Sequence, residues 1–421
     1  MSPKPREQVS QLLLLTVVAA AGIFARTTLG PLQEAARIAL SLSDNQMALL
    51  QGLALALPLL LAAIPLGLCV DRYSRILLLR LATVLNALAS AAAAGAVSFD
   101  ALMAARCVVG LAAPATAIAA YSVLADQFDS TQRGRATMVV MLGQVGGAAA
   151  AFAVGGELLA FFGFGPEAWR RAMLSMAVLM APVIVVTFAL REPARREFPT
   201  VKPAIREIAP ALWAHRRMIA TLIMGTALVN LADGAALVWA APALSRGFHL
   251  TADRIGAIMG TALAVGGLLG PVIGGMLADL CERNGGPRRT LWVMSALALA
   301  SVPAGCFAVM PAIAAASIPL VLFLMIGNAL SVMVTALCIV AMPNELRGLC
   351  MALQFAAGAV FGLGLAPVIV SLLSGAIGGP QSIGGALAVV CVTTSLLGAA
   401  ALAFGAQTVP PRTRRLLVSS P

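Results

Sequence analysis

The chain has few charged and few aromatic residues. Of its 421 residues, 11% are charged and 5% are aromatic, whereas 60% are hydrophobic. A soluble domain carries roughly 25% charged residues, so this composition excludes a water-soluble globular protein. Apolar runs of about 20 residues, long enough to cross the hydrocarbon core of a bilayer as helices, recur from end to end. The sequence therefore predicts an all-α polytopic membrane protein.

Residues that support catalysis or metal binding are equally scarce. The chain has two histidines, His215 and His249, near span ends, and no cluster with metal-ligand spacing. Its seven cysteines are scattered without a C-x-x-C pair, so we interpret them as small apolar packing residues. The G-x-x-x-x-G-K-S/T sequence of ATP-driven proteins is absent. We therefore expect no metal, no cofactor and no enzymatic activity.

The hydropathy pattern predicts twelve transmembrane helices. No cleavable signal is expected, because the first apolar segment continues past Arg26 without an A-x-A-like site in a polar setting. Pro319 leaves open a break within the tenth span. The predicted spans are 11–36, 46–70, 76–97, 101–127, 136–163, 171–190, 217–245, 254–279, 290–309, 314–342, 348–374 and 384–406.

The net charge of +11 is explained by where the basic residues lie. With the amino terminus inside, most of the 28 Lys and Arg residues fall in loops and tails on the cytoplasmic side. This asymmetry is the positive-inside pattern, so both termini are expected in the cytoplasm. The basic balance therefore indicates topology, and no nucleic-acid partner is implied.

The longest polar interruption, residues 191–217, separates two groups of six spans. It is rich in charge and in proline, as expected of a connection between two bundles. We predict an N-terminal six-helix bundle over 1–190 and a cytoplasmic linker over 191–216. A C-terminal six-helix bundle with a short cytoplasmic tail is predicted over 217–421.

The two halves resemble each other in sequence. Three pairs of stretches align in the same order, namely 42–52 with 250–260 (250 − 42 = 208), 67–75 with 275–283 (275 − 67 = 208) and 132–136 with 345–349 (347 − 133 = 214 for the shared Arg-Gly pair). Three matches in order favour duplication over chance. Two parallel six-helix repeats about an axis along the membrane normal are typical of secondary transporters.

These charged turns also carry a resemblance to a known family. "GLCVDRYSR" at 67–75 resembles the loop signature of the major facilitator superfamily, and "ARCVVGLAAPATAIAAYSVLADQFDSTQRGRA" at 105–136 is similar to its fourth span and following loop. "SLSDNQMALLQGLALAL", "WRRA", "LREPAR" and "MPNELRG" resemble its spinster-like bacterial branch. The resemblance implies a monomeric multi-pass transporter of the bacterial inner membrane that works by alternating access. Eukaryotic relatives of this branch move lysolipids and sphingoid lipids.

The chain departs from this branch at two positions. The branch usually carries an acid directly before the first-span arginine, where this chain has Ala25. It also usually has a glutamate after the glycines of the fourth span, where this chain has Ala113. Arg26 and Arg106 remain while both acids are gone, so the proton-coupling residues of the branch do not carry over to this chain.

Arg26 and Arg106 are charges within predicted spans. At 1.5 Å per residue, Arg26 lies about 22 Å from the inner edge and Arg106 roughly 8–10 Å below the outer edge. A charge there costs at least ~2 kcal/mol unless it faces a cavity or a partner. Asp233 in the seventh span lies at similar depth, and Glu157 lies near the outer end of the fifth. We predict that both arginines bind an anionic substrate and that Asp233 or Glu157 carries a proton. The alternative is that Arg26 snorkels toward the outer interface or pairs with Asp233 only to brace the helices.

Two further groups complete the predicted site. The polar side chains of Tyr121, Asn230 and Asn328 are expected to line the substrate cavity. In the charged turns, carboxylates and arginines at helix ends can lock helices until a movement breaks the pairs, although such a turn can also be an ordinary positive-inside loop. Glu34 and Arg37, near the outer interface, are expected to be solvated. The predicted gating residues are Asp71, Arg72, Arg75, Arg133, Asp279 and Arg283.

These observations predict a secondary transporter that moves a small organic anion or an anionic amphipathic molecule across the lipid bilayer, coupled to protons. Export of a drug or a lysolipid is the alternative within transport. A membrane-embedded enzyme would need a nucleophile–base or metal constellation, which the sequence lacks. A purely structural or receptor protein would not require buried arginines or a duplicated charged loop.

Overall fold

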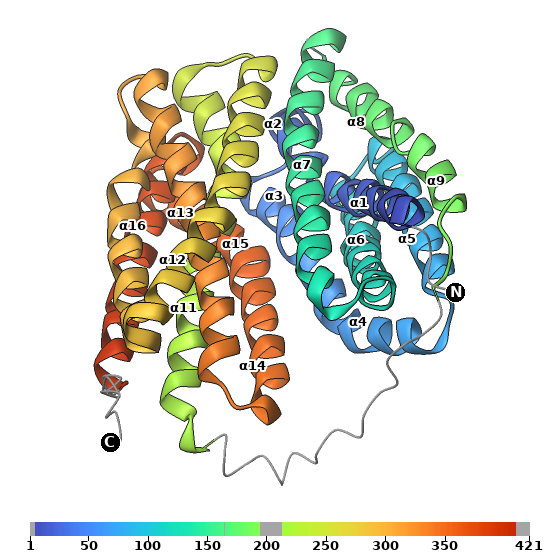
Figure 1. Ribbon diagram of the computed structural model, residues 1–421. Coiled ribbons are helices and arrows are strands. Elements are labelled where there is room, and N and C mark those ends of the chain that lie inside the picture. Colours follow the sequence, from blue (N-terminus) through green and yellow to red (C-terminus); the bar gives the residue numbers. More distant parts are fainter. Residues whose placement is uncertain (1–4, 164, 194–212, 410–421) are drawn as a thin grey trace, which may run out of the picture.

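A computed structural model describes residues 5–163, 165–193 and 213–409 of the chain (Figure 1). These residues are helical between short turns, and the described ranges contain no strand. The helices are α1 (Pro5–Thr27), α2 (Leu29–Ala39), α3 (Asp44–Gln51), α4 (Leu53–Arg72), α5 (Arg75–Ala94), α6 (Phe99–Gln127), α7 (Ser130–Phe162), α8 (Ala168–Val178), α9 (Ala181–Phe188), α11 (Arg216–Phe248), α12 (Ala252–Ala304), α13 (Ile313–Ala341), α14 (Asn344–Ala357), α15 (Ala366–Ile377) and α16 (Ile383–Thr408), with the short segments η1 (Phe307–Val309), η2 (Gly358–Leu365) and η3 (Gly379–Ser382).

The helices supply the twelve spans that the hydropathy pattern predicts. Within the described ranges, 11 stretches are long and apolar enough to cross a membrane, and one of them, Ala252–Val309, is 58 residues long. Since about 20 residues cross the hydrocarbon core, this stretch holds two spans. The chain turns between them at Gly286, whose φ of 66° and ψ of −159° are not helical. The tenth span, α13, runs continuously through Pro319.

Helices α1–α9 form one bundle and helices α11–α16 form a second (Figure 1). We call the end of the molecule near residues 72–75 and 213–216 the linker face, and the opposite end near residues 40–43 and 249–251 the far face. The predicted linker 191–216 falls largely on residues 194–212, which lie outside the described residues.

Helix starts follow the sequence repeat. Helix α3 begins at Asp44 and α12 at Ala252, 208 residues later (252 − 44), while α7 begins at Ser130 and α14 at Asn344, 214 residues later (344 − 130). These are the offsets of the aligned stretches. At the start of α3, the Ser43 hydroxyl accepts a hydrogen bond from the backbone N–H of Gln46, and the Gln46 side-chain oxygen accepts one from the backbone N–H of Ser43. This capping box fixes the helix start.

In the part of the chain that the structure describes, four spans are interrupted, and one of them is the sixth, in which α8 ends at Val178 and α9 begins at Ala181. The first span breaks between α1 and α2 at Thr28, and the second breaks between α3 and α4 at Gly52. The eleventh contains the π-helical segment η2. Interruptions of this kind occur in transmembrane helices where neighbouring side chains re-satisfy the freed backbone groups.

Small residues bring the two bundles together along two seams. A Cβ atom placed on Gly156 of α7 would lie 2.9 Å from the Cα atom of Gly256 in α12. On the other side, a Cβ atom on Gly52 would lie 2.9 Å from the carbonyl oxygen of Gly364 in η2. Glycines allow helix backbones to approach this closely. Both seams lie toward the far face.

The hydrophobic core shows on which side the bundles close. One cluster of buried side chains near the far face joins both bundles, with Phe152 and Trp169 from the first and Trp239 and Phe307 from the second. Toward the linker face the core divides into one cluster within each bundle. Because apolar packing is continuous across the bundles at the far face only, the structure is closed there.

Candidate functional site

Arg106 is buried inside the N-terminal bundle, with 1% of its surface exposed. Its guanidinium donates hydrogen bonds to the carbonyl oxygens of Arg26 (2.9 Å) and Leu50 (3.3 Å) and to the side-chain oxygen of Gln51 (3.1 Å). Both carbonyls lie within two residues of the interruptions in the first and second spans. Arg106 therefore joins these two spans to the fourth at the points where their helices break.

The polar contacts of Arg106 continue into the first span. The Gln51 side-chain nitrogen donates to the side-chain oxygen of Gln33 in α2 (3.1 Å), and both glutamines are buried. The side-chain nitrogen of Gln33 has no hydrogen-bond partner among the described residues. A buried polar chain of this kind rigidifies the helices that contribute to it.

The side chain of Arg26 has a different environment. It is half-buried in α1, and within the described ranges its guanidinium makes no hydrogen bond or ion pair. Its backbone carbonyl, by contrast, is held by Arg106. The two arginines therefore lie next to each other, as expected from their similar depth in the membrane. Of the two guanidinium groups, that of Arg26 has no partner among the described residues. An ionisable group at membrane depth without a partner is the usual mark of a functional site.

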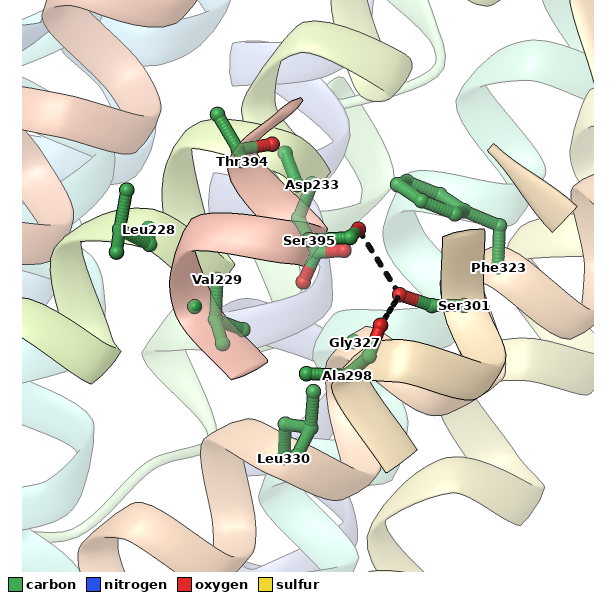
Figure 2. A pocket seen from close by; sticks show the side chains of 12 residues that line it. Leu228, Val229, Asp233, Ala298, Ser301, Phe323, Gly327, Leu330, Thr394 and Ser395 are labelled. Atoms are coloured by element: carbon green, nitrogen blue, oxygen red, sulfur yellow. Dashed lines mark hydrogen bonds between the residues drawn. The ribbon is translucent and has the colours of Figure 1, made fainter. Parts of the chain in front are cut away.

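Asp233 is the corresponding acid of the C-terminal bundle. It faces a cavity of about 20 Å³ between α11, α12, α13 and α16, room for about one water molecule (Figure 2). Its carboxylate lies directly against Gly327 of α13, where a larger residue would not fit. Ser301 and Ser395, which share a hydrogen bond of 2.9 Å, line the same cavity. No described residue pairs with the Asp233 carboxylate.

The other predicted acid, Glu157, lies elsewhere. It is exposed near the far-face end of α7 and takes part in none of the ion pairs formed among the described residues. Arg26 and Asp233 belong to opposite bundles, and the described residues contain no ion pair between them. The structure thus brings Arg26 and Arg106 together and leaves the two acids apart.

The predicted cavity-lining side chains make local hydrogen bonds. The Tyr121 hydroxyl donates to Gln144, which joins α6 to α7 at 3.0 Å. Asn230 and Asn328 each donate to a carbonyl four residues earlier in the same helix, both at 2.8 Å. Asn230 also lies against the π-helical segment η2, next to Gly362. Their contact with a substrate stays a prediction.

Among the predicted gating residues, Arg75 lies at the centre of a charged cluster on the linker face. It is 2% exposed, and its guanidinium pairs with Asp126 at the end of α6 and with Glu192 after α9 (2.8 Å to Glu192). Arg133 donates to the carbonyl oxygen of Ala125 (2.7 Å). These contacts all lie within the N-terminal bundle.

The remaining gating residues are less engaged. Arg72, Asp279 and Arg283 are exposed at the linker face. The side chain of Asp71 lies outside the described residues, so its predicted pairing with a nearby arginine stays a prediction.

Glu192 caps the start of α5. Its carboxylate accepts hydrogen bonds from the Ser74 hydroxyl (2.6 Å), from Arg75 and from the backbone N–H groups of Arg75 (3.1 Å) and Ile76 (3.0 Å). Partial burial alone would raise the pKa of Glu192, but these donors outweigh it and lower the pKa to about 2. The segment that leaves the sixth span is thus attached to the third.

A second charged cluster, which was not predicted from the sequence, joins the two bundles at the far face. Arg246, at the end of α11, pairs with Glu34 of α2 (2.7 Å) and Asp44 of α3 (2.7 Å). Arg246 also donates to the carbonyl oxygen of Pro380 (2.9 Å), and Arg37 pairs with Glu34 (2.7 Å). We call Glu34, Arg37, Asp44 and Arg246 the far-face cluster.

The expectation that Glu34 and Arg37 are solvated is therefore wrong. Closure of the far face brings Arg246 onto them from a position 212 residues further along the chain than Glu34. The signal available in the sequence was the presence of unpaired acids and arginines at span ends on the same side of the membrane.

The contacts of Arg106 predict a structural effect of its substitution. Arg106→Gln should lower the free energy of unfolding by several kcal/mol, because each hydrogen bond to a charged group contributes roughly 1.5–3 kcal/mol. Thermal unfolding in detergent measures this, with Arg72→Gln, at an exposed position, as the matched control. The structural role of Arg106 would be contradicted if Arg106→Gln unfolded at the wild-type temperature but no longer bound ligand.

The lowered pKa of Glu192 predicts a pH-dependent contribution to stability. Because the folded-state pKa lies below the ordinary value of ~4.3, the stabilisation is complete above about pH 5 and is lost as the pH falls toward 2. The melting temperature of Glu192→Gln should therefore lie below that of wild type at pH 7, and the gap should narrow in acid. Glu167→Gln, at an exposed position, is the control. A gap that does not change with pH would refute this.

Known proteins share the sequence pattern and the fold described above. Residues 13–362 match the family model of the Major Facilitator Superfamily. An MFS-type efflux pump of Mycolicibacterium smegmatis is 27% identical over 292 residues, which cover 67% of this chain and 65% of the pump. The chain thus spans about two thirds of the pump's length.

Solved structures share the fold at low sequence identity. A bacterial homologue of the human lysosomal transporter Spinster, in an inward-facing and unoccupied conformation, superposes with a TM-score of 0.77 at 19% identity, over 96% of each chain. A D-xylose–proton symporter superposes with a TM-score of 0.71 at 14% identity, over 93% of this chain and 97% of that one. With its twelve spans in two repeated bundles, the chain belongs to the Major Facilitator Superfamily, a family of membrane transporters.

Proposed function

We propose that this chain moves a small organic anion or an anionic amphipathic molecule by alternating access, coupled to protons. The proposal rests on two opposite charges at membrane depth that have no partner among the described residues, Arg26 in the first bundle and Asp233 in the second. In a purely structural protein such charges would be paired, because an isolated charge in a low-dielectric interior costs several kcal/mol. Transport requires charges that change partners.

Arg26 is the group proposed to bind the anion. A guanidinium presents planar, paired N–H donors that match a carboxylate or phosphate. The backbone from which it projects is fixed by the hydrogen bond from Arg106. Arg106 itself is almost fully buried and its donors are directed at protein acceptors. We therefore assign Arg106 to the positioning of Arg26, rather than to direct substrate contact.

Asp233 is the group proposed to carry the proton. In its small, largely apolar cavity the neutral carboxyl costs less free energy than the charged one, and the cavity has room for about one water molecule that can deliver a proton. The exposed Glu157 has neither feature. Proton uptake at Asp233 would then favour movement of the C-terminal bundle, and anion binding at Arg26 would favour movement of the N-terminal bundle.

The charge asymmetry of the loops supports the orientation. The linker face carries most of the Lys and Arg residues, so we place that face and both termini in the cytoplasm of a bacterium, with the chain in the inner membrane. The far face, where the core is continuous, is then the outer face. The described conformation is accordingly inward-facing.

Export of an amphipathic compound is the second candidate, and the similarity to an efflux pump favours it. An apolar groove of about 520 Å³ lies on α3, α4 and α6, lined by residues that include Leu53, Leu57 and Cys107. Cys107 directly follows Arg106 in α6, so an apolar tail in this groove would lie near the arginine pair. Uptake into inverted vesicles, which corresponds to export from the cell, separates the two directions.

The first test is ligand binding by purified protein. A panel of carboxylates, sulfonates and lysophospholipids is screened by thermal shift, because a binder raises the melting temperature with its concentration. Arg26→Gln should abolish the shift, and Arg26→Lys should restore only part of it, because an ammonium lacks the planar donor pair. Arg135→Gln, exposed on the linker face, is the matched control. A full shift retained by Arg26→Gln would exclude this binding site.

The second test concerns the proton. In proteoliposomes, Asp233→Asn should leave counterflow of the anion close to the wild-type rate but stop accumulation driven by a pH gradient. Counterflow exchanges substrate without net proton movement, so only accumulation needs a titrating group. Glu157→Gln serves as the control and should retain both. Accumulation by Asp233→Asn at the wild-type level would exclude Asp233 as the proton carrier.

A further inference from the structure

The far-face cluster divides unequally between the two bundles. Glu34, Arg37 and Asp44 belong to the first bundle and together carry a net charge of −1, whereas Arg246 alone belongs to the second. While the far face is closed, the four charges neutralise one another, and the two carboxylates each lie 2.7 Å from Arg246. The side chains of Arg246 and Asp44 are each 9% exposed, so these pairs are shielded from water.

Opening of the far face must break these pairs. Under the alternating access that the proposed function assumes, the bundles separate there and Arg246 leaves with the second bundle. Glu34 and Asp44 then share one cation, Arg37, which lies 2.7 Å from Glu34 and 3.7 Å from Asp44. Two neighbouring carboxylates with a single positive partner favour binding of a proton.

We propose that Glu34 and Asp44 form a second proton-binding site, which takes up one proton from the outer solution when the bundles separate. The proton replaces the charge of Arg246 and so stabilises the open far face. This site is distinct from Asp233, which lies within the second bundle and faces its own cavity. The outer face would therefore open more readily in acid.

The surroundings contain other charged groups, none of which pairs with the cluster among the described residues. Helix α11, which carries Arg246, is followed directly by the exposed His249. The segment around Pro380 contributes a carbonyl oxygen that accepts a hydrogen bond from Arg246. The other helices packed nearby contribute Arg26 from α1, Asp100 and Arg106 from α6, Glu157 from α7, Arg170 and Arg171 from α8, and Asp253 and Arg254 from α12. His249 is the histidine among these groups, so it requires its own control.

The size of the effect follows from proton linkage. If one proton binds on opening, the ratio of open to closed molecules rises by up to about tenfold for each unit that the pH falls, between the pKa values of the two states. Below both values, or above both, the ratio becomes independent of pH. Two protons would allow a steeper dependence, and none would give a flat line.

The experiment measures the opening itself, independently of transport. Spin labels are attached at Ile38→Cys on α2 and Gly247→Cys on α11, an exposed residue and a glycine with open space beside it. The partly exposed native cysteines Cys69, Cys107 and Cys306 are replaced by alanine. Distance distributions are recorded by double electron–electron resonance in lipid nanodiscs between pH 8 and pH 5. We expect a longer-distance population that grows in acid.

Variants identify the groups responsible. Glu34→Gln with Asp44→Asn should give the long distance at every pH, and Arg246→Gln should do the same if the double variant does not fold. His249→Gln should keep the wild-type pH response. Asp233→Asn removes the proposed proton carrier and should still keep the part of the response that the far-face cluster contributes, so a failure of the proton carrier in transport stays distinguishable from a failure here. The inference is overturned if the wild-type distance does not depend on pH, or if the double variant keeps the full dependence.

Discussion

A charge inside a membrane protein must be paired or must have a use, and this constraint organises the structure. Arg106, Arg75 and Arg246 all satisfy their guanidinium groups with carbonyls or carboxylates from other helices. Each thereby connects elements that the sequence separates widely. Arg26 and Asp233 do not follow this pattern, because within the described ranges neither has a partner. These two charges are therefore the ones that we expect an anionic substrate and a proton to neutralise.

The paired charges also define the moving parts. Around Arg75, on the linker face, the contacts join helices of one bundle, so they stabilise that bundle in any conformation. Around Arg246, on the far face, the contacts join the two bundles, so they must form and break. The hydrophobic core divides in the same way, since it is continuous across the bundles at the far face and separate toward the linker face. Glycine pairs such as Gly156 and Gly256 complete this reversible contact.

Much of this could be read from the sequence, because composition and periodicity are local signals. The apolar runs predicted twelve spans, the repeat predicted two bundles, and a count of helical rise placed Arg26 and Arg106 at one depth. What the side chains contact could not be read. The break at Thr28 precedes Pro31 and the second break falls on Gly52, residue types that interrupt helices. The sequence does not show, however, that Arg106 would engage the backbone carbonyls next to these breaks. The partners of Arg246 lie more than 200 residues away, as their 202-residue and 212-residue separations show.

The central claim is that Arg26 and Asp233 are independent, unpaired charges rather than a brace between the bundles. A double-mutant cycle on the stability of the purified protein tests it most directly, using Arg26→Gln, Asp233→Asn and both together. Independent charges predict that neither single change destabilises the protein and that the two effects add to within about 0.5 kcal/mol. A brace predicts that each single change leaves a lone buried charge and destabilises the protein, by roughly 3–5 kcal/mol for a buried pair, and that the double change restores stability and transport. That recovery would contradict the account.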